Sequence, residues 1–178
     1  LNIGTEIPNM TSQLNNQIIE KYCGPNYYYG IRDSGCISYG GYYQWGEAVQ
    51  YLQGASNTTS PIPSFTGNVQ GICPIGWHLP SEIEWTTLFN ALGGDSIAGI
   101  SLKSTSLAWN SAYGGGGGTN SSGFNALPSL SYVETGFWSS NSLRSSDAKA
   151  LDLASFDIGA RFDFKNKAFS ISVRCIKD

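Results

Sequence analysis

The sequence predicts an α+β fold with two short helices, small antiparallel sheets and long irregular loops. Three observations point to this class. Residues 81–92 combine a helix start signal with an apolar stripe at helical spacing, and residues 169–175 alternate apolar and polar side chains as a half-buried strand does. From residue 99 onward serine, glycine and asparagine dominate, and 22 of the 178 residues are glycine, which favours loops over regular elements.

The first of these segments, residues 81–92, is predicted to be a helix. Ser81 is a preferred N-cap residue, and Glu84 lies three residues later, where its side chain can accept a hydrogen bond from the Ser81 amide. The apolar residues that follow recur at helical spacing, at Trp85, Leu88, Phe89 and Leu92. Gly93 suits the left-handed residue that ends a helix. The stripe is expected to face a core.

The chain before this helix is predicted to be mostly irregular. Residues 1–22 look extended and then irregular, residues 42–45 form a short strand, and residues 46–52 begin a second short helix, with Glu47 near its positive end. Residues 53–70 are rich in Gly, Ser, Thr, Asn and Pro and form a loop. Because the chain opens without Met, on residues that read as the end of a strand, its opening strand is expected to be truncated.

After the helix the sequence predicts one variable loop region and then a terminal sheet. The glycine run within residues 113–120 disfavours regular structure. Four strands are expected after it, forming an antiparallel meander, at residues 137–140, 148–154, 160–164 and 169–176. Residues 157–159 and 165–167 are its predicted turns. We expect one domain spanning residues 1–178, a length that needs no second core.

Composition narrows the classes of partner. Charged residues make up 13% of the chain and the formal net charge is −3, without a basic cluster, so nucleic acid is not an expected partner. There is no run of 18 apolar residues, so no transmembrane segment is predicted.

Four cysteines, Cys23, Cys36, Cys73 and Cys175, permit three pairings if all are bridged. Their spacing favours Cys23–Cys36, which flank a loop rich in Gly, Pro and Tyr, together with Cys73–Cys175, which joins the start of the helical segment to the last strand. An oxidising compartment is therefore favoured. The alternative is a zinc site, but no two cysteines show C-x2-C spacing and His78 is the only histidine.

A set of motifs spread along the chain carries a resemblance to a known family, at residues 1–4, 41–48, 71–81, 102–105, 118–128, 137–140 and 172–175. As a set they resemble the Fibrobacter succinogenes major paralogous domain family, which shares a C-type-lectin-like fold with the formylglycine-generating sulfatase-modifying proteins. The resemblance implies that fold, and it implies an exported, often lipid-anchored surface protein of Bacteroidota or related bacteria. Most members have no defined activity.

The resemblance also sets expectations about location and chemistry. It implies an extracellular or outer-membrane surface location, with a lipid anchor upstream of the given chain. Where calcium-dependent lectins of the wider fold carry Trp-Asn-Asp, this chain has Asn110-Ser111 after Trp109, so calcium-mediated sugar binding is not expected. Formylglycine-generating relatives hold copper with two close C-terminal cysteines, and here only Cys175 is in that part. An opening edge strand left unpaired is expected to recruit another chain.

The residues themselves do not predict an enzyme. His78 lies beside Trp77 just before the helix cap, where a structural hydrogen bond is favoured over catalysis. Glu82 and Glu84 share the first helical turn, which suits the helix dipole better than a catalytic pair. The glycine run 114–118 lacks the Lys-Ser or Lys-Thr of a phosphate-binding loop.

No cofactor is predicted, and calcium is the one metal left open. Four aspartates near the C-terminus supply oxygen ligands of the kind that calcium prefers, at Asp147, Asp152, Asp157 and Asp163. Their spacing is not that of an EF-hand, so turn and solvent-facing roles are favoured.

The leading hypothesis is a non-catalytic surface module that binds a glycan or an envelope protein through the loops of residues 104–147. The mixture of aromatic and amide side chains there is typical of recognition surfaces. Six side chains are the candidate contacts, the first two as flat platforms and the others as hydrogen-bonding groups: Trp109, Tyr113, Asn110, Asn120, Asn141 and Arg144. Trp138 is assigned to the core. The alternative is a structural subunit of an outer-membrane or cell-surface assembly.

Overall fold

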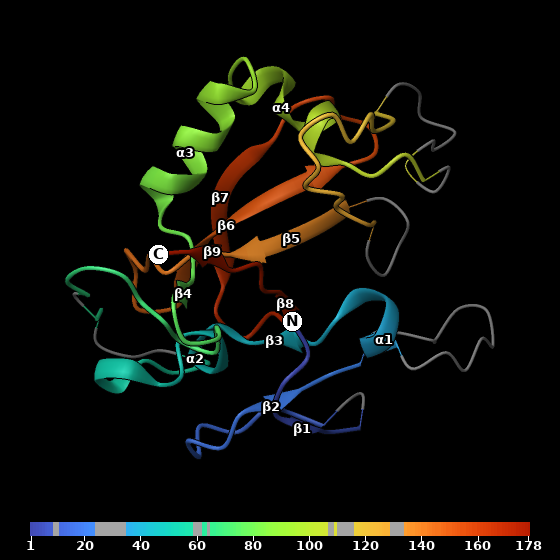
Figure 1. The fold of residues 1–178 in the computed structure, drawn as a ribbon. Helices are drawn as coiled ribbons and strands as arrows, with labels where there is room; N and C mark the ends of the chain where they lie inside the picture. The colour runs from blue at the N-terminus through green and yellow to red at the C-terminus, as the bar shows by residue number, and fades with distance from the viewer. Residues whose placement is uncertain are drawn as a thin grey trace. The chain divides into compact units, whose positions relative to one another are not determined.

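The computed structural model describes most of the chain, namely residues 1–8, 11–23, 35–58, 62–63, 65–106, 109, 116–128 and 134–178. Figure 1 follows the chain from the N-terminus to the C-terminus. By its internal contacts the chain divides into two compact units. Unit 1 comprises residues 1–81, 137–150 and 164–178, and unit 2 comprises residues 82–136 and 151–163. That the whole chain is one folding domain stays a prediction. The elements are a mixture of helices and strands, so the predicted α+β class is confirmed.

The largest sheet has five strands in the order β3-β8-β5-β6-β7. These strands are β3 (Tyr42–Tyr43), β8 (Ile171–Ser172), β5 (Glu134–Trp138), β6 (Asp147–Ala154) and β7 (Arg161–Asn166). β8 pairs antiparallel with β3 and parallel with β5. The predicted terminal meander is therefore wrong in its last strand, because β8 is separated from β7 and lies between β3 and β5.

Buried contacts of Lys167 explain why the chain leaves β7 without forming the predicted hairpin. The Trp45 amide donates to the Lys167 carbonyl at 3.1 Å. The Lys167 ammonium donates to the Ser145 carbonyl at 2.9 Å and lies 4.7 Å from the centroid of the Trp45 ring. These contacts hold the segment after β7 against Trp45, which the structure places directly after β3.

Two small sheets complete the strands. β1 (Thr5–Glu6) pairs parallel with β2 (Glu20–Lys21), and β4 (Trp77–His78) pairs antiparallel with β9 (Ile176–Lys177). His78, which is buried, has its Nδ1 atom 2.6 Å from Asp178 Oδ1. This contact is of the structural kind that the sequence predicts for the only histidine.

Both predicted disulfides are confirmed. Cys23 is bonded to Cys36 and Cys73 to Cys175, and both bridges belong to unit 1. Strand pairing brings the two cysteines of the long bridge together. Cys73 precedes β4 and Cys175 precedes β9, and these two strands pair with each other.

The core of unit 1 surrounds two tryptophans. Trp45 and Trp138 are fully buried, and each indole N–H donates to a carbonyl, that of Ser139 at 3.0 Å and that of Tyr43 at 2.7 Å. The placement of Trp138 in the core is thus confirmed. Small and branched side chains fill the space around these rings: Ala48, Val49, Val69, Ile72, Leu79, Ala148, Ala150 and Val173.

Five short helical segments are present in the described ranges. Unit 1 holds α1 (Gly35–Tyr39), α2 (Trp45–Ala48) and the 3-10 turn η1 (Leu52–Gly54), and unit 2 holds α3 (Glu82–Ala91) and α4 (Asp95–Leu102). α3 confirms the predicted helix, with Trp85 and Phe89 buried on its apolar face. The Trp85 ring makes an edge contact with Phe124 at 5.9 Å between centroids.

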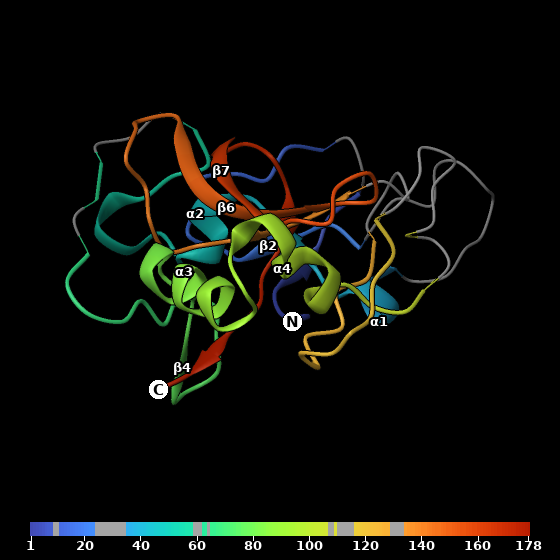
Figure 2. The ribbon, with the colours of Figure 1, turned by 90° about the horizontal axis from the view of Figure 1, so that it is seen from above.

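The helix α4 was not predicted from the sequence, and its contacts explain why it forms. α3 and α4 lie next to each other in both ribbon views (Figure 2). α4 is also tied to the turn before β7, since the Ala160 amide donates to the Asp95 carbonyl at 2.7 Å and the Ile100 amide to the Ile158 carbonyl at 3.0 Å. At Gly99 a Cβ atom would lie 1.9 Å from the Gly159 carbonyl oxygen. Glycine lowers helix propensity but permits this close approach.

A buried carboxylate organises the N-terminal part of unit 1. Glu47 is fully buried in α2, and its oxygens accept hydrogen bonds from the Tyr51 hydroxyl at 2.5 Å, the Asn57 amide at 3.0 Å and the Glu20 backbone amide at 3.1 Å. Burial raises the pKa of Glu47 above 4.5, and the hydrogen bonds from Tyr51, Glu20 and Asn57 only partly oppose this.

The raised pKa of Glu47 predicts a specific dependence of stability on pH. The folded state holds this proton more tightly than the unfolded state, so the contribution of Glu47 to stability falls as pH rises from 4.5 through the folded pKa, and it is constant above. Urea unfolding from pH 4 to 8 should show this fall in the native protein and not in Glu47→Gln. The exposed Glu6→Gln serves as a control for charge. Parallel profiles for the native protein and Glu47→Gln would contradict the assignment.

Candidate functional site

The structure describes four of the six residues that the sequence proposes as ligand contacts. Trp109 is fully buried in unit 2, where its indole N–H contacts the Ala126 carbonyl at 3.0 Å and the Ser104 hydroxyl at 3.2 Å. Its role as an exposed platform is therefore wrong, because a ring enclosed by protein offers no face to a ligand. Asn110 and Tyr113 lie outside the described residues.

The other three predicted contacts have different surroundings. Asn120 is half-buried in unit 2, and its side-chain oxygen accepts the Asn125 amide at 2.7 Å. Asn141 and Arg144 belong to unit 1, where the exposed Arg144 lies 4.4 Å from the centroid of the Phe164 ring. These residues are thus divided between the units, and their proposed role in binding stays a prediction.

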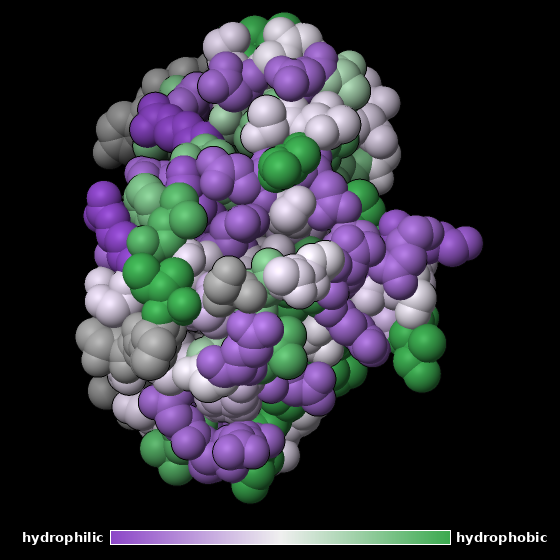
Figure 3. Space-filling model, turned by 90° about the vertical axis from the view of Figure 1, so that its left-hand side faces the viewer, coloured by the Kyte–Doolittle hydropathy of each residue, from purple (hydrophilic) through white to green (hydrophobic). Residues whose placement is uncertain are grey.

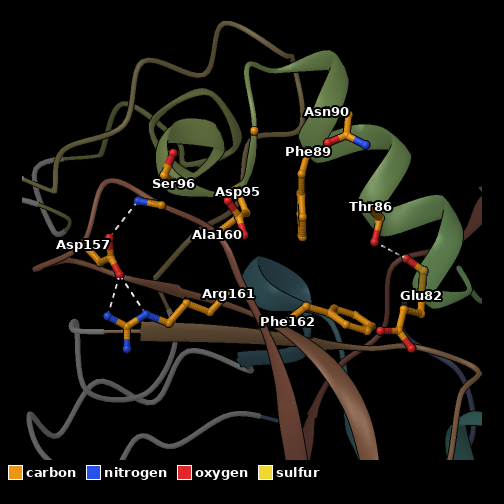
Figure 4. Close-up of a pocket in the computed structure, with 12 residues that line it drawn as sticks. Glu82, Thr86, Phe89, Asn90, Asp95, Ser96, Asp157, Ala160, Arg161 and Phe162 are labelled. Atoms are coloured by element: carbon orange, nitrogen blue, oxygen red, sulfur yellow. Dashed lines mark hydrogen bonds and ion pairs between the residues drawn. The ribbon is translucent and has the colours of Figure 1, made fainter.

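Unit 2 contains a pocket of about 590 Å³. Its walls are one face of α3, the start of α4 and the segment from Asp157 to the start of β7. Figure 4 shows the rings of Phe89 and Phe162 directed into this space, one from α3 and one from β7. Phe89 keeps only 4% of its surface exposed, whereas Phe162 is half-buried. The Phe162 ring is therefore the part of the apolar floor that a ligand can reach, whereas Phe89 is almost wholly covered.

The first residues of both helices bring polar groups to the pocket. Glu82 begins α3 and Asp95 begins α4, and carboxylates are favoured at these positions by the helix dipole. The Thr86 hydroxyl donates to the Glu82 carbonyl at 2.8 Å within the helix. Asn90, one turn after Thr86, adds an exposed carboxamide to the lining. The pocket thus has oxygen acceptors around its apolar floor.

An ion pair fixes the third side of the pocket. Arg161 Nη2 lies 2.7 Å from Asp157 Oδ2, and Arg161 Nε donates to the same oxygen at 2.8 Å. The Gly159 amide donates to Asp157 Oδ1 at 2.9 Å. This backbone hydrogen bond is the largest cause of a lowered pKa of Asp157, and the Arg161 guanidinium adds to it. Asp157 is therefore ionised at neutral pH, and both of its oxygens accept hydrogen bonds.

The sequence did not predict the pocket, because three of its lining residues had local explanations. Glu82 reads as a cap residue, Phe89 as part of a core stripe and Asp157 as part of a turn. The signal that was available is the Arg161-Phe162-Asp163 run, in which an aromatic side chain alternates with charges at the start of a strand. Two residues of this run line a pocket only because helices that lie about 70 residues earlier in the sequence form its other walls.

In the ranges that the structure describes, no group of three or more His, Cys, Asp and Glu side chains is placed to hold a metal ion. The described helices are also too short or too polar for any of them to span a bilayer.

Comparisons with known proteins give a family. No curated protein and no solved structure matched the chain. The sequence model of the Fibrobacter succinogenes major domain matches residues 2–177, nearly the whole chain. The protein therefore belongs to the Fibrobacter succinogenes major domain family.

Proposed function

We propose that this protein is a non-catalytic recognition module at the cell surface and that the pocket of unit 2 binds a glycan. The observation that carries the proposal is the combination of the half-buried Phe162 ring with carboxylate and carboxamide groups around one pocket of about 590 Å³. This volume lies within the range of small-ligand sites, which join apolar walls to a few directed polar groups. A sugar ring presents a C–H face to an aromatic side chain and hydroxyls to charged acceptors, whose hydrogen bonds are the stronger ones.

Further observations support recognition outside the cytoplasm. The two disulfides favour an oxidising compartment.

On the face shown in Figure 3, the coloured apolar residues form separate groups among hydrophilic ones instead of one broad area. A broad apolar area would favour protein docking. A lipid anchor, the C-type-lectin-like fold, and glycan or envelope-protein contacts through the loops of residues 104–147 remain parts of the proposal.

Binding to a glycan array and the effect of Phe162→Ala test the proposal. We expect Phe162→Ala to weaken binding of the best array ligand about fivefold, since an aromatic contact contributes about 1 kcal/mol. Phe169→Ala is a matched control, because Phe169 is 58% exposed and belongs to unit 1. It should leave the dissociation constant unchanged. Circular dichroism verifies that both variants fold.

Two results would contradict the proposal. One is a blank array for the folded protein, and the other is equal weakening by Phe162→Ala and Phe169→Ala. Native mass spectrometry distinguishes a glycan-binding module from a structural subunit of an assembly. A stoichiometric protein partner that survives purification from the envelope would favour the assembly subunit.

A further inference from the structure

We propose that the pocket of unit 2 selects a glycan that carries a cationic amine, so that its preferred ligand is an amino sugar with a free amino group. The inference rests on the proposed function and names the chemical class of its ligand. It follows from the charge of the pocket lining and from the aromatic rings beside that charge.

The formal charge of the pocket is negative. Its lining holds three carboxylates, those of Glu82, Asp95 and Asp157, and one guanidinium, that of Arg161, so three negative charges and one positive charge leave −2. The guanidinium is already engaged, because two of its nitrogens lie 2.7 and 2.8 Å from Asp157 Oδ2. The Asp157–Arg161 pair is formally neutral, so the formal charge of −2 corresponds to the carboxylates of Glu82 and Asp95.

The helix N-termini carry positive partial charge, which offsets the negative charge of the carboxylates. The size of this offset decides whether a cationic or an anionic ligand is favoured. Glu82 and Asp95 are the first residues of α3 and α4, of ten and eight residues. Each helix N-terminus carries a positive partial charge of roughly half an elementary charge, so two of them offset about one of the two negative charges. The pocket stays negative by about one charge, and a cationic group is favoured over an anionic one.

The accessible ring of the pocket, that of Phe162, favours the same group. An ammonium near the face of an aromatic ring is attracted by the ring quadrupole, and carboxylates beside the rings add charge-assisted hydrogen bonds. Figure 4 shows the carboxylates at the sides of the space into which the Phe89 and Phe162 rings are directed. A free amino group on a sugar can use both interactions, whereas an N-acetyl group has lost the charge that they need.

Isothermal titration with oligosaccharides of equal length tests this inference. The probes are a glucosamine oligomer, its fully N-acetylated form and a neutral glucose oligomer, with a linear polyamine and a uronic acid oligomer for comparison. We expect the glucosamine oligomer to bind at least tenfold more tightly than the N-acetylated and neutral forms, and the uronic acid oligomer to bind most weakly. Added salt should reduce this preference.

Carboxylate variants locate the preference in the pocket. Asp95→Asn and Glu82→Gln should each weaken binding of the glucosamine oligomer severalfold more than binding of the neutral oligomer. The matched control is Glu6→Gln, which removes one exposed negative charge in unit 1 and should preserve the preference. Circular dichroism confirms the fold of each variant.

The outcomes separate this inference from the proposed function. Equal binding of amine and neutral oligomers would overturn the amine preference and leave glycan recognition in place, whereas no binding of any oligosaccharide would overturn both. Tighter binding of the uronic acid oligomer would show that the helix N-termini dominate and would overturn the inference. Equal binding of the polyamine would show that the amine is read without a sugar and would overturn the assignment to an amino sugar.

Discussion

Replacement of Cys73 and Cys175 by alanine is expected to lower the free energy of unfolding by about 4 to 5 kcal/mol, as the chain-entropy model gives for a loop near 100 residues. The bridge closes a loop with a sequence separation of 102 residues. Cys73 also belongs to the core cluster of unit 1, beside Ile72 and Leu79. Because domains of this size have a total stability of about 5 to 15 kcal/mol, the loss is a large fraction of it. Urea unfolding followed by circular dichroism measures the change.

The second bridge provides the matched control. Cys23 and Cys36 are 13 residues apart, and a loop of about this length contributes roughly 3 kcal/mol in the same model. The variant with both residues changed to alanine should therefore be destabilised less than the variant without the long bridge. The reverse order would show that the stabilisation does not follow loop length in this protein.

Local signals in the sequence predicted the elements whose determinants lie close together in the chain. The helix α3 begins directly after Ser81, as its capping box indicates, and its apolar stripe is on the buried side at Trp85 and Phe89. The disulfide pairing was also predictable, because one pair flanks a short loop and the other joins two segments with distinct patterns.

Tertiary contacts decided the elements that the sequence did not predict. The segment 169–176 alternates as one strand would, but the structure forms β8 at Ile171–Ser172 and β9 at Ile176–Lys177, on two different sheets. The chain passes from the partner β3 to the partner β4 within a few residues, and Cys175 is bonded to Cys73 between them. Alternation reports which side chains are buried and not which strand lies beside them.

The candidate site likewise depends on tertiary contacts that local sequence patterns do not reveal. An aromatic residue in a loop rich in Ser, Gly and Asn resembles an exposed platform, and only the structure shows that Trp109 is enclosed. The pocket of unit 2 joins α3 and α4 to a segment that begins at Asp157. No local pattern connects these segments, since their contact depends on the close approach of α4 to Gly159.

Lys103→Met is expected to lower the free energy of unfolding by about 3 kcal/mol or more. This is the second large effect on stability, after the loss of the long disulfide. Lys103 is fully buried at the end of α4, and its ammonium donates to three carbonyls, those of Gly116, Ala154 and Asp157. Methionine fills a similar volume but leaves these acceptors unpaired, and each buried unsatisfied group costs about 1 to 3 kcal/mol. Chemical denaturation gives the measurement, with the exposed Lys177→Met as the control.

The cation also rests on an aromatic ring, so the variant tests more than hydrogen bonding. Lys103 Nζ lies 5.2 Å from the centroid of the buried Trp109 ring. Since the ammonium connects the end of α4 with the glycine-rich segment at Gly116 and with the chain after β6, its loss should loosen all three. Tryptophan fluorescence of Lys103→Met should then differ from that of the native protein below the unfolding transition. An unchanged unfolding free energy would show that the three carbonyls find other partners.

The pH dependence of stability separates the charge of Lys103 from its packing. Burial lowers the pKa of Lys103 from 10.5 to about 8, and the Asp157 carboxylate only partly opposes this. Between pH 8 and 10.5 the unfolded state binds more protons, so the contribution of this group to stability rises with pH by about 3 kcal/mol across that window and is constant below it. The native protein should therefore gain stability relative to Lys103→Met over this window. A constant difference would mean that the three carbonyls hold the ammonium well enough to cancel its burial, and that Lys103 stays charged throughout.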